Sequence, residues 1–172
     1  NGSRFKVWGE FYREVGKAET DFFVFGIDFR HYQKIHRNIV FATRIAANTS
    51  LGHQRLLSYL GGVDNWLGPQ FDYSILPDPS QNFQFQTITT PVRGFYQNVR
   101  NGNSFTLINN ELRVPVFKYF SNKPIKSSFL ENFMAVGFGD VGAAWTGANP
   151  YTSDNTFNTI LVEGFNYEII LQ

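Results

Sequence analysis

A strict alternation of apolar and polar side chains, sustained over long segments, most constrains the fold of this chain. Between residues 21 and 33, the side chains of Phe23, Phe25, Ile27 and Phe29 fall on one face of an extended strand, and mainly polar or small residues fall on the other. Because successive side chains of a strand point to opposite faces, this period of two predicts a half-buried β-strand. Roughly six segments of about a dozen residues each follow the pattern. They lie at about residues 4–14, 21–33, 38–48, 104–117, 129–145 and 160–171.

The length of these segments bears on the class of protein. Strands of soluble proteins average about 5–6 residues, whereas a tilted transmembrane β-strand needs about 9–11 residues. Aromatic residues make up 17% of the 172 residues, yet the mean hydropathy is only −0.24, which suits strands that are apolar on one face. We therefore predict an all-β fold that forms part of a transmembrane antiparallel β-barrel. Since the smallest membrane barrels have about eight strands, we expect further strands before Asn1 and after Gln172.

A long region between the third and fourth segments, at about residues 49–103, has no sustained alternation. It contains turn-forming pairs such as Gly61-Gly62 and Asn101-Gly102, which predict irregular backbone. Bacterial outer-membrane barrels carry their long loops on the extracellular side, so we expect residues 49–103 to be a long extracellular loop. Residues 56–60 are predicted to form a short helix within it. The short turns at residues 34–37 and 120–127 are then expected on the periplasmic side.

Two motifs and one acidic residue combine an arginine with carboxylates. They are the loop motif Val92-Arg93-Gly94-Phe95, Glu111 in the following strand, and Phe138, Asp140, Gly142 and Trp145 in the strand after it. Strand parity allows Glu111 and Asp140 to point to the same side of two neighbouring antiparallel strands. A guanidinium group offers a rigid fork of donors that matches carboxylates. Acids within otherwise apolar alternating strands therefore suggest that the Arg93 loop folds back into a polar interior. The alternative is a solvated surface arginine and an ordinary strand acid.

These motifs, in this order and spacing, resemble the BamA/TamA-type outer-membrane barrel superfamily, also described as the bacterial surface antigen family. The resemblance covers about residues 85–145 well and implies that residues 1–172 are a fragment of one C-terminal β-barrel domain. It implies that Arg93 reaches Glu111 and Asp140 inside the barrel, with Phe138 and Gly142 alongside. The chain departs from the family at Gly61-Gly62, which resembles a double glycine that usually lies a few residues before the loop motif; here about 30 residues intervene.

The resemblance also implies a function, namely assembly or insertion of other proteins into the bacterial outer membrane. The expected partners are outer-membrane lipid, client outer-membrane proteins and accessory lipoproteins or complex subunits. A barrel that opens a seam can pair the backbone groups of an entering strand, which lipid cannot solvate. No enzymatic activity, metal or cofactor is expected.

Two other readings remain open from the sequence. A barrel of the same architecture can instead export a passenger through its lumen or act as a passive transporter; upstream periplasmic domains would separate these roles. From another class, a soluble aromatic-rich β-sandwich that binds glycans would show similar strand patterns. Detergent dependence separates the sandwich from a membrane barrel, because only the barrel exposes its apolar face to lipid.

Several classes of function have little support. The formal net charge is +1, which gives no electrostatic basis for binding nucleic acid. The chain has no cysteine, so it has neither disulfides nor thiolate sites. His31, His36 and His53 lack the spacing of a metal site, and no Gly-x-Ser-x-Gly motif is present.

Overall fold

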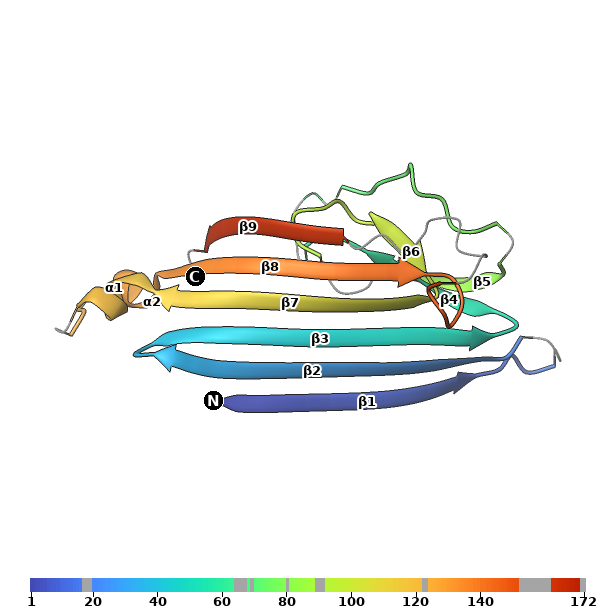
Figure 1. The fold of residues 1–172 in the computed structure, drawn as a ribbon, viewed down its shortest axis with the longest axis horizontal. Coiled ribbons are helices and arrows are strands. Elements are labelled where there is room, and N and C mark those ends of the chain that lie inside the picture. The colour runs from blue at the N-terminus through green and yellow to red at the C-terminus, as the bar shows by residue number, and fades with distance from the viewer. Residues whose placement is uncertain are drawn as a thin grey trace.

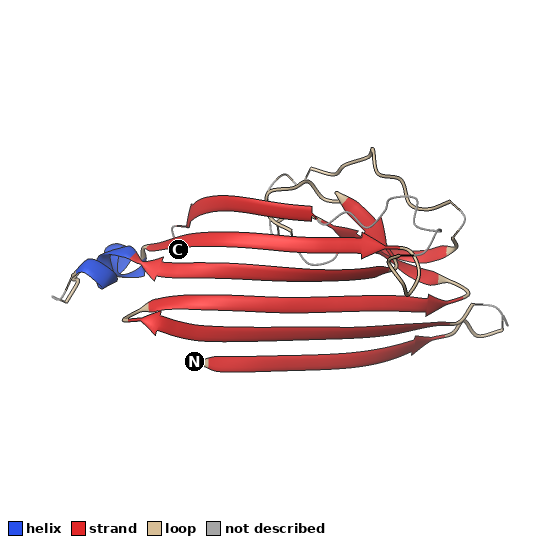
Figure 2. Cartoon of the chain, viewed as in Figure 1, coloured by secondary structure: helices blue, strands red, loops and turns tan. Residues whose placement is uncertain are grey.

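The computed structural model describes residues 1–16, 20–63, 68, 70–79, 81–88, 92–121, 124–151 and 162–170. Most of these residues lie in strands, and the prediction of an all-β fold with an antiparallel sheet is confirmed, although two strands of a smaller sheet pair in parallel (Figures 1 and 2). Six strands form one large antiparallel sheet in the order β1-β2-β3-β7-β8-β9. They are β1 (Gly2–Tyr12), β2 (Phe22–His36), β3 (Ile39–Gly52), β7 (Ser104–Pro115), β8 (Met134–Trp145) and β9 (Val162–Ile170).

A second, smaller sheet lies at one end of the large one, near the C-terminal end of β3 and the start of β7 (Figure 1). It contains β4 (Arg55–Leu60), β5 (Phe83–Ile88) and β6 (Arg100–Gly102), in the order β5-β4-β6. The predicted helix at residues 56–60 is therefore wrong, and the region 49–103 is not irregular throughout. Four consecutive residues of β4, from Leu57 to Leu60, are buried. A strand buried on both faces shows no alternation, which explains why the sequence pattern missed it.

Two short helices replace strand where the predicted boundaries were too wide. Helix α1 (Val116–Phe120) follows β7 directly, and α2 (Ser128–Asn132) precedes β8. Pro115 ends β7 and is the N-cap of α1, because proline has no N–H to donate to a neighbouring strand. Neither of the helices in the described part of the chain is long and apolar enough to cross a membrane.

The two faces of the large sheet differ sharply. One face, here called the outer face, carries the apolar stripe read from the sequence; Phe23 and Phe25 on β2 are 56% and 54% exposed. The register places Phe5 opposite Phe29 and Ile45 opposite Ile108, so the same face continues over β1, β3 and β7. Its exposed apolar side chains are Phe5, Val7, Phe11, Phe23, Phe25, Ile45, Leu51, Ile108 and Leu112.

The opposite, inner face carries the buried core at the end nearest the small sheet. Ala46, Phe105, Leu107 and Ala144 from the large sheet pack there with Leu60 of β4 and Val92. Further along the strands, the inner face is charged, with Asp28, Arg30, Arg44, Glu111 and Asp140. The core thus forms between the sheet and the chain segments that connect β3 to β7.

Glycines allow close approaches on the inner face. The ring of Trp8 on β1 lies over Gly26 of β2, where an added Cβ would come within 2.2 Å of the ring. At Gly102 of β6, an added Cβ would lie 2.2 Å from the backbone oxygen of Trp145 on β8. The small sheet therefore approaches the large sheet backbone to backbone at this point.

We expect Gly102→Ala to lower the free energy of unfolding by about 1–3 kcal/mol, because rigid backbone must move to admit one methyl group. Chemical denaturation of the two proteins measures the change. Gly137→Ala is the matched control, since an added Cβ at Gly137 on β8 has no neighbour within 4 Å. Equal stability of the two variants would show that β6 and β8 are not in close contact.

Candidate functional site

The loop that carries Arg93 is anchored on the inner face by its first described residue. Val92 is fully buried among Ala46, Leu107 and Ala144. Gly142 of β8 makes room for it, because an added Cβ at Gly142 would lie 3.1 Å from Cγ2 of Val92. The glycine of the strand motif thus lets the loop motif dock against β8.

Gly61 and Gly62 hold the other side of this loop. The backbone N–H of Gly62 donates to the carbonyl of Phe95 at 2.9 Å. An added Cβ at Gly61 would lie only 2.0 Å from the carbonyl oxygen of Tyr96, and Gly61 has a φ of +114°. Despite their separation in sequence, the two glycines touch the loop motif directly. The fold therefore brings Gly61 and Gly62 next to the loop motif, from which they are far apart in the sequence.

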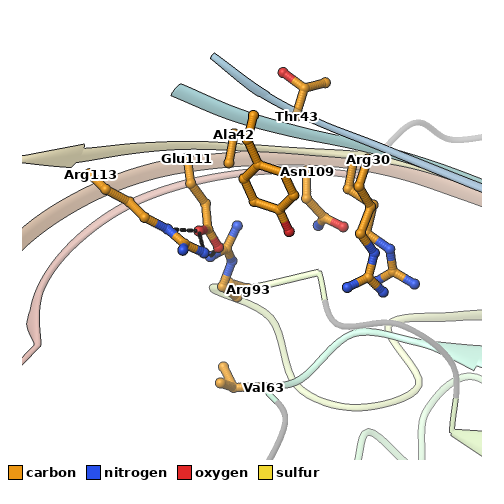
Figure 3. Close-up of a pocket in the computed structure, with 10 residues that line it drawn as sticks. Arg30, Ala42, Thr43, Val63, Arg93, Asn109, Glu111 and Arg113 are labelled. Carbon is orange, nitrogen blue, oxygen red and sulfur yellow. Dashed lines mark hydrogen bonds and ion pairs between the residues drawn. The ribbon is translucent and has the colours of Figure 1, made fainter. Parts of the chain in front are cut away.

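Arg93 is bound to carboxylates from two neighbouring strands, Asp140 on β8 and Glu111 on β7, and Figure 3 shows Arg93 beside Glu111. Its Nε and Nη2 atoms donate to Oδ2 and Oδ1 of Asp140, both at 2.7 Å, which is a bidentate ion pair. Its backbone N–H also donates to Oδ2 of Asp140 at 2.9 Å. Nη1 donates to Oε1 of Glu111 at 2.5 Å. The contacts expected between Arg93 and both acids are thus present.

The network is largely sealed from solvent. The side chain of Asp140 is 0% exposed and that of Arg93 14% exposed. Burial disfavours the charged guanidinium, but hydrogen bonding and charge from Asp140, with a further contribution from Glu111, outweigh it and raise the pKa of Arg93 above its ordinary value. Arg93 therefore stays protonated, as its pairing requires.

Aromatic and basic neighbours complete the Arg93 site. The guanidinium carbon lies 4.1 Å from the centre of the Phe138 ring, within cation–π range. Phe95 instead packs against the apolar core, so only one of the two motif phenylalanines lies against the arginine. Arg113 donates Nε and Nη2 to Oε2 of Glu111 at 2.8 and 2.6 Å. Glu111 is therefore shared by two arginines.

A second ionic cluster lies nearby on the inner face and was not recognised in the sequence. Asp28 accepts from Nε of Arg30 and from Nε of Arg44, each at 2.9 Å, and from Nη2 of Arg44 at 2.6 Å. Arg30 and Arg44 are directly opposed on β2 and β3. A β-bulge between Lys34 and His36 sets this register; an unshifted hairpin would oppose Arg30 to Ile45 instead. Because the alternating pattern does not predict this bulge, it does not predict that Arg30 and Arg44 lie opposite each other.

A cavity of about 280 Å³ separates the charged part of the inner face from the connecting segments. In Figure 3, Arg30, Glu111 and Arg113 point from the sheet toward Arg93, whereas Thr43 points to the other side of the sheet. Val63 lies on the facing wall. The residues that line the cavity are Arg30, Tyr32, Ala42, Thr43, Arg44, Val63, Arg93, Asn109, Glu111 and Arg113.

The arrangement holds the Arg93 loop against the sheet by ion pairs. Among the described residues, no group of three or more histidine or acidic side chains is placed to hold a metal ion. Comparison with family models, with curated proteins and with solved structures finds no match to this chain.

We expect Arg93→Ala to lower stability by about 3–5 kcal/mol, because Asp140 is left as a buried, unpaired carboxylate. Arg93→Lys is expected to lose less, since it keeps the charge but not the bidentate geometry. Denaturation measures the stability, and limited proteolysis measures protection of residues 92–100. Arg13→Ala, which removes an exposed arginine from the segment that follows β1, is the control. An Arg93→Ala protein as stable and as protected as this control would contradict the expected role of the ion pairs.

Proposed function

We propose that this chain forms part of a transmembrane antiparallel β-barrel of the bacterial outer membrane that assembles or inserts other outer-membrane proteins. The observation that carries the proposal is the Arg93 loop, folded onto the inner face and paired there with Asp140 and Glu111. This is the contact expected from the resemblance to the BamA/TamA-type superfamily. The proposal therefore rests on a specific side-chain arrangement as well as on the strand pattern.

The distribution of polarity over the large sheet supports a membrane setting. Large apolar side chains such as Phe5, Phe23 and Phe25 are more than half exposed on the outer face, while the ionic clusters lie on the inner face. Soluble sandwiches bury the apolar face between two sheets, so this distribution is the reverse of theirs. Strand length agrees, since β2 and β3 have 15 and 14 residues, against about 9–11 needed to cross a bilayer at a tilt.

The proposed activity is physical and involves no covalent step. A strand entering lipid has unpaired backbone N–H and C=O groups that hydrocarbon cannot solvate. A barrel edge can pair these groups by strand addition while the client folds. The docked Arg93 loop braces β7 and β8 from inside, so that another part of the barrel can open without collapse of its wall.

The first test of the membrane setting places a charged side chain on the outer face. We expect Phe25→Lys to impair membrane integration, because a lysine on the lipid face of a membrane barrel is destabilising, by up to about 2–4 kcal/mol at the bilayer midplane. Phe120→Lys is the matched control, since Phe120 is 77% exposed in α1, outside the sheet. The measurement is the fraction of each protein that stays in membranes after alkaline extraction. A wild-type protein that remains soluble without detergent would instead favour the soluble β-sandwich.

The assembly role needs a separate measurement. In cells whose only copy carries Arg93→Ala, we expect a lower yield of folded client outer-membrane proteins, detected by their heat-dependent mobility on gels. Arg13→Ala, at an exposed arginine away from the Arg93 site, should leave client folding unchanged. Normal client folding in cells that contain the Arg93→Ala protein at the wild-type level would exclude a role of this loop in assembly.

A further inference from the structure

Three arginines stand in one row across the inner face. The register aligns Arg4 of β1 with Arg30 of β2, and Arg30 with Arg44 of β3. Like charges directly opposed on neighbouring strands repel one another. Asp28 contacts Arg30 and Arg44 and offsets part of this repulsion, and a bound anion would offset more of it.

Cations outnumber carboxylates among the described residues that line the cavity and the acids they contact. Four arginines line the cavity, namely Arg30, Arg44, Arg93 and Arg113. They contact three carboxylates, which are Asp28, Glu111 and Asp140. Four positive and three negative charges leave an excess of one at the cavity.

The arginines also keep donors that these acids do not use. Arg44 and Arg113 both direct Nε and Nη2 to a carboxylate, and neither Asp28 nor Glu111 accepts from their Nη1 atoms. A guanidinium has five N–H donors, so the two on each Nη1 are not committed to these acids. The side chains of Arg30 and Arg113 are 38% and 43% exposed, which leaves them accessible from the cavity.

We propose that the inner-face cavity binds a phosphate group through Arg30, Arg44 and Arg113. A phosphate monoester carries a charge of about −1.5 to −2 at neutral pH and has three acceptor oxygens, so it can offset the excess positive charge and accept from three guanidinium groups at once. The cavity volume of about 280 Å³ corresponds to several water molecules at about 30 Å³ each, enough for a phosphate group. The site depends on these side chains alone and not on the proposed assembly function.

Titration of the full chain, in detergent if it requires one, tests the site. Inorganic phosphate and glycerol 3-phosphate are added separately, and binding is followed by calorimetry and by the ³¹P line width, with sodium chloride at equal ionic strength as the reference. We expect saturable binding of at least one of the two phosphate compounds. Binding of glycerol 3-phosphate alone would assign the site to a phosphate ester, and binding of both would assign it to the free ion as well.

The variants are chosen so that no acid is left unpaired. In Arg30→Gln with Arg113→Gln, Asp28 keeps Arg44 and Glu111 keeps Arg93. We expect this double variant to bind phosphate at least tenfold more weakly, whereas Arg37→Gln, which removes a charge outside the cavity, should bind as the wild type does.

A second variant keeps every arginine in place. Val63→Glu introduces a carboxylate from the facing wall of the cavity, which should occupy the arginines and abolish phosphate binding. Val63→Gln is its matched control and should retain binding. Binding no stronger than the chloride reference, or unchanged binding by both the double variant and Val63→Glu, would overturn the proposal.

Discussion

The buried ion pair between Arg93 and Asp140 is the interaction on which the rest of the inner face depends. A carboxylate with no solvent exposure requires a partner, and the loop residue Arg93 supplies it with two parallel hydrogen bonds to Asp140. The pair therefore ties the loop to β8, and the additional bond to Glu111 ties it to β7. Removing one charge from such a site is costly because the other remains buried.

Small residues make this approach possible. Gly142 admits Val92 against β8, and Gly61 and Gly62 let β4 and the loop come into backbone contact. The loop is thus fixed from both sides, by apolar packing next to Arg93 and by hydrogen bonds beyond it. Asn98 adds to this, because its amide donates to the carbonyls of Asp72 and Ile75. A charged side chain held this firmly pays little further entropy when it binds its carboxylates.

Sharing of acids between arginines links the Arg93 site to the cavity. Asp28 and Glu111 each contact two arginines, so the four arginines that line the cavity contact only three carboxylates among the described residues. The same sharing means that Arg30 or Arg113 can be removed without leaving an acid unpaired. The outer face has no such requirement, and its exposed apolar side chains suit a setting in which water is absent.

The long strands and their two faces follow from the amino-acid sequence, because a period of two is a local property that fixes the side of each residue. Strand parity also places Glu111 and Asp140 on one face, whereas their pairing with Arg93 was implied by the resemblance to a known family. The small sheet, the contact of Gly61 and Gly62 with the loop, and the opposition of Arg30 to Arg44 arise only in the folded chain. The sequence pattern of the small sheet shows no alternation, because β4 is buried on both faces. The contact of Gly61 and Gly62 with the loop joins segments that are distant in the chain. The opposition of Arg30 to Arg44 depends on a bulge that shifts the register by one residue.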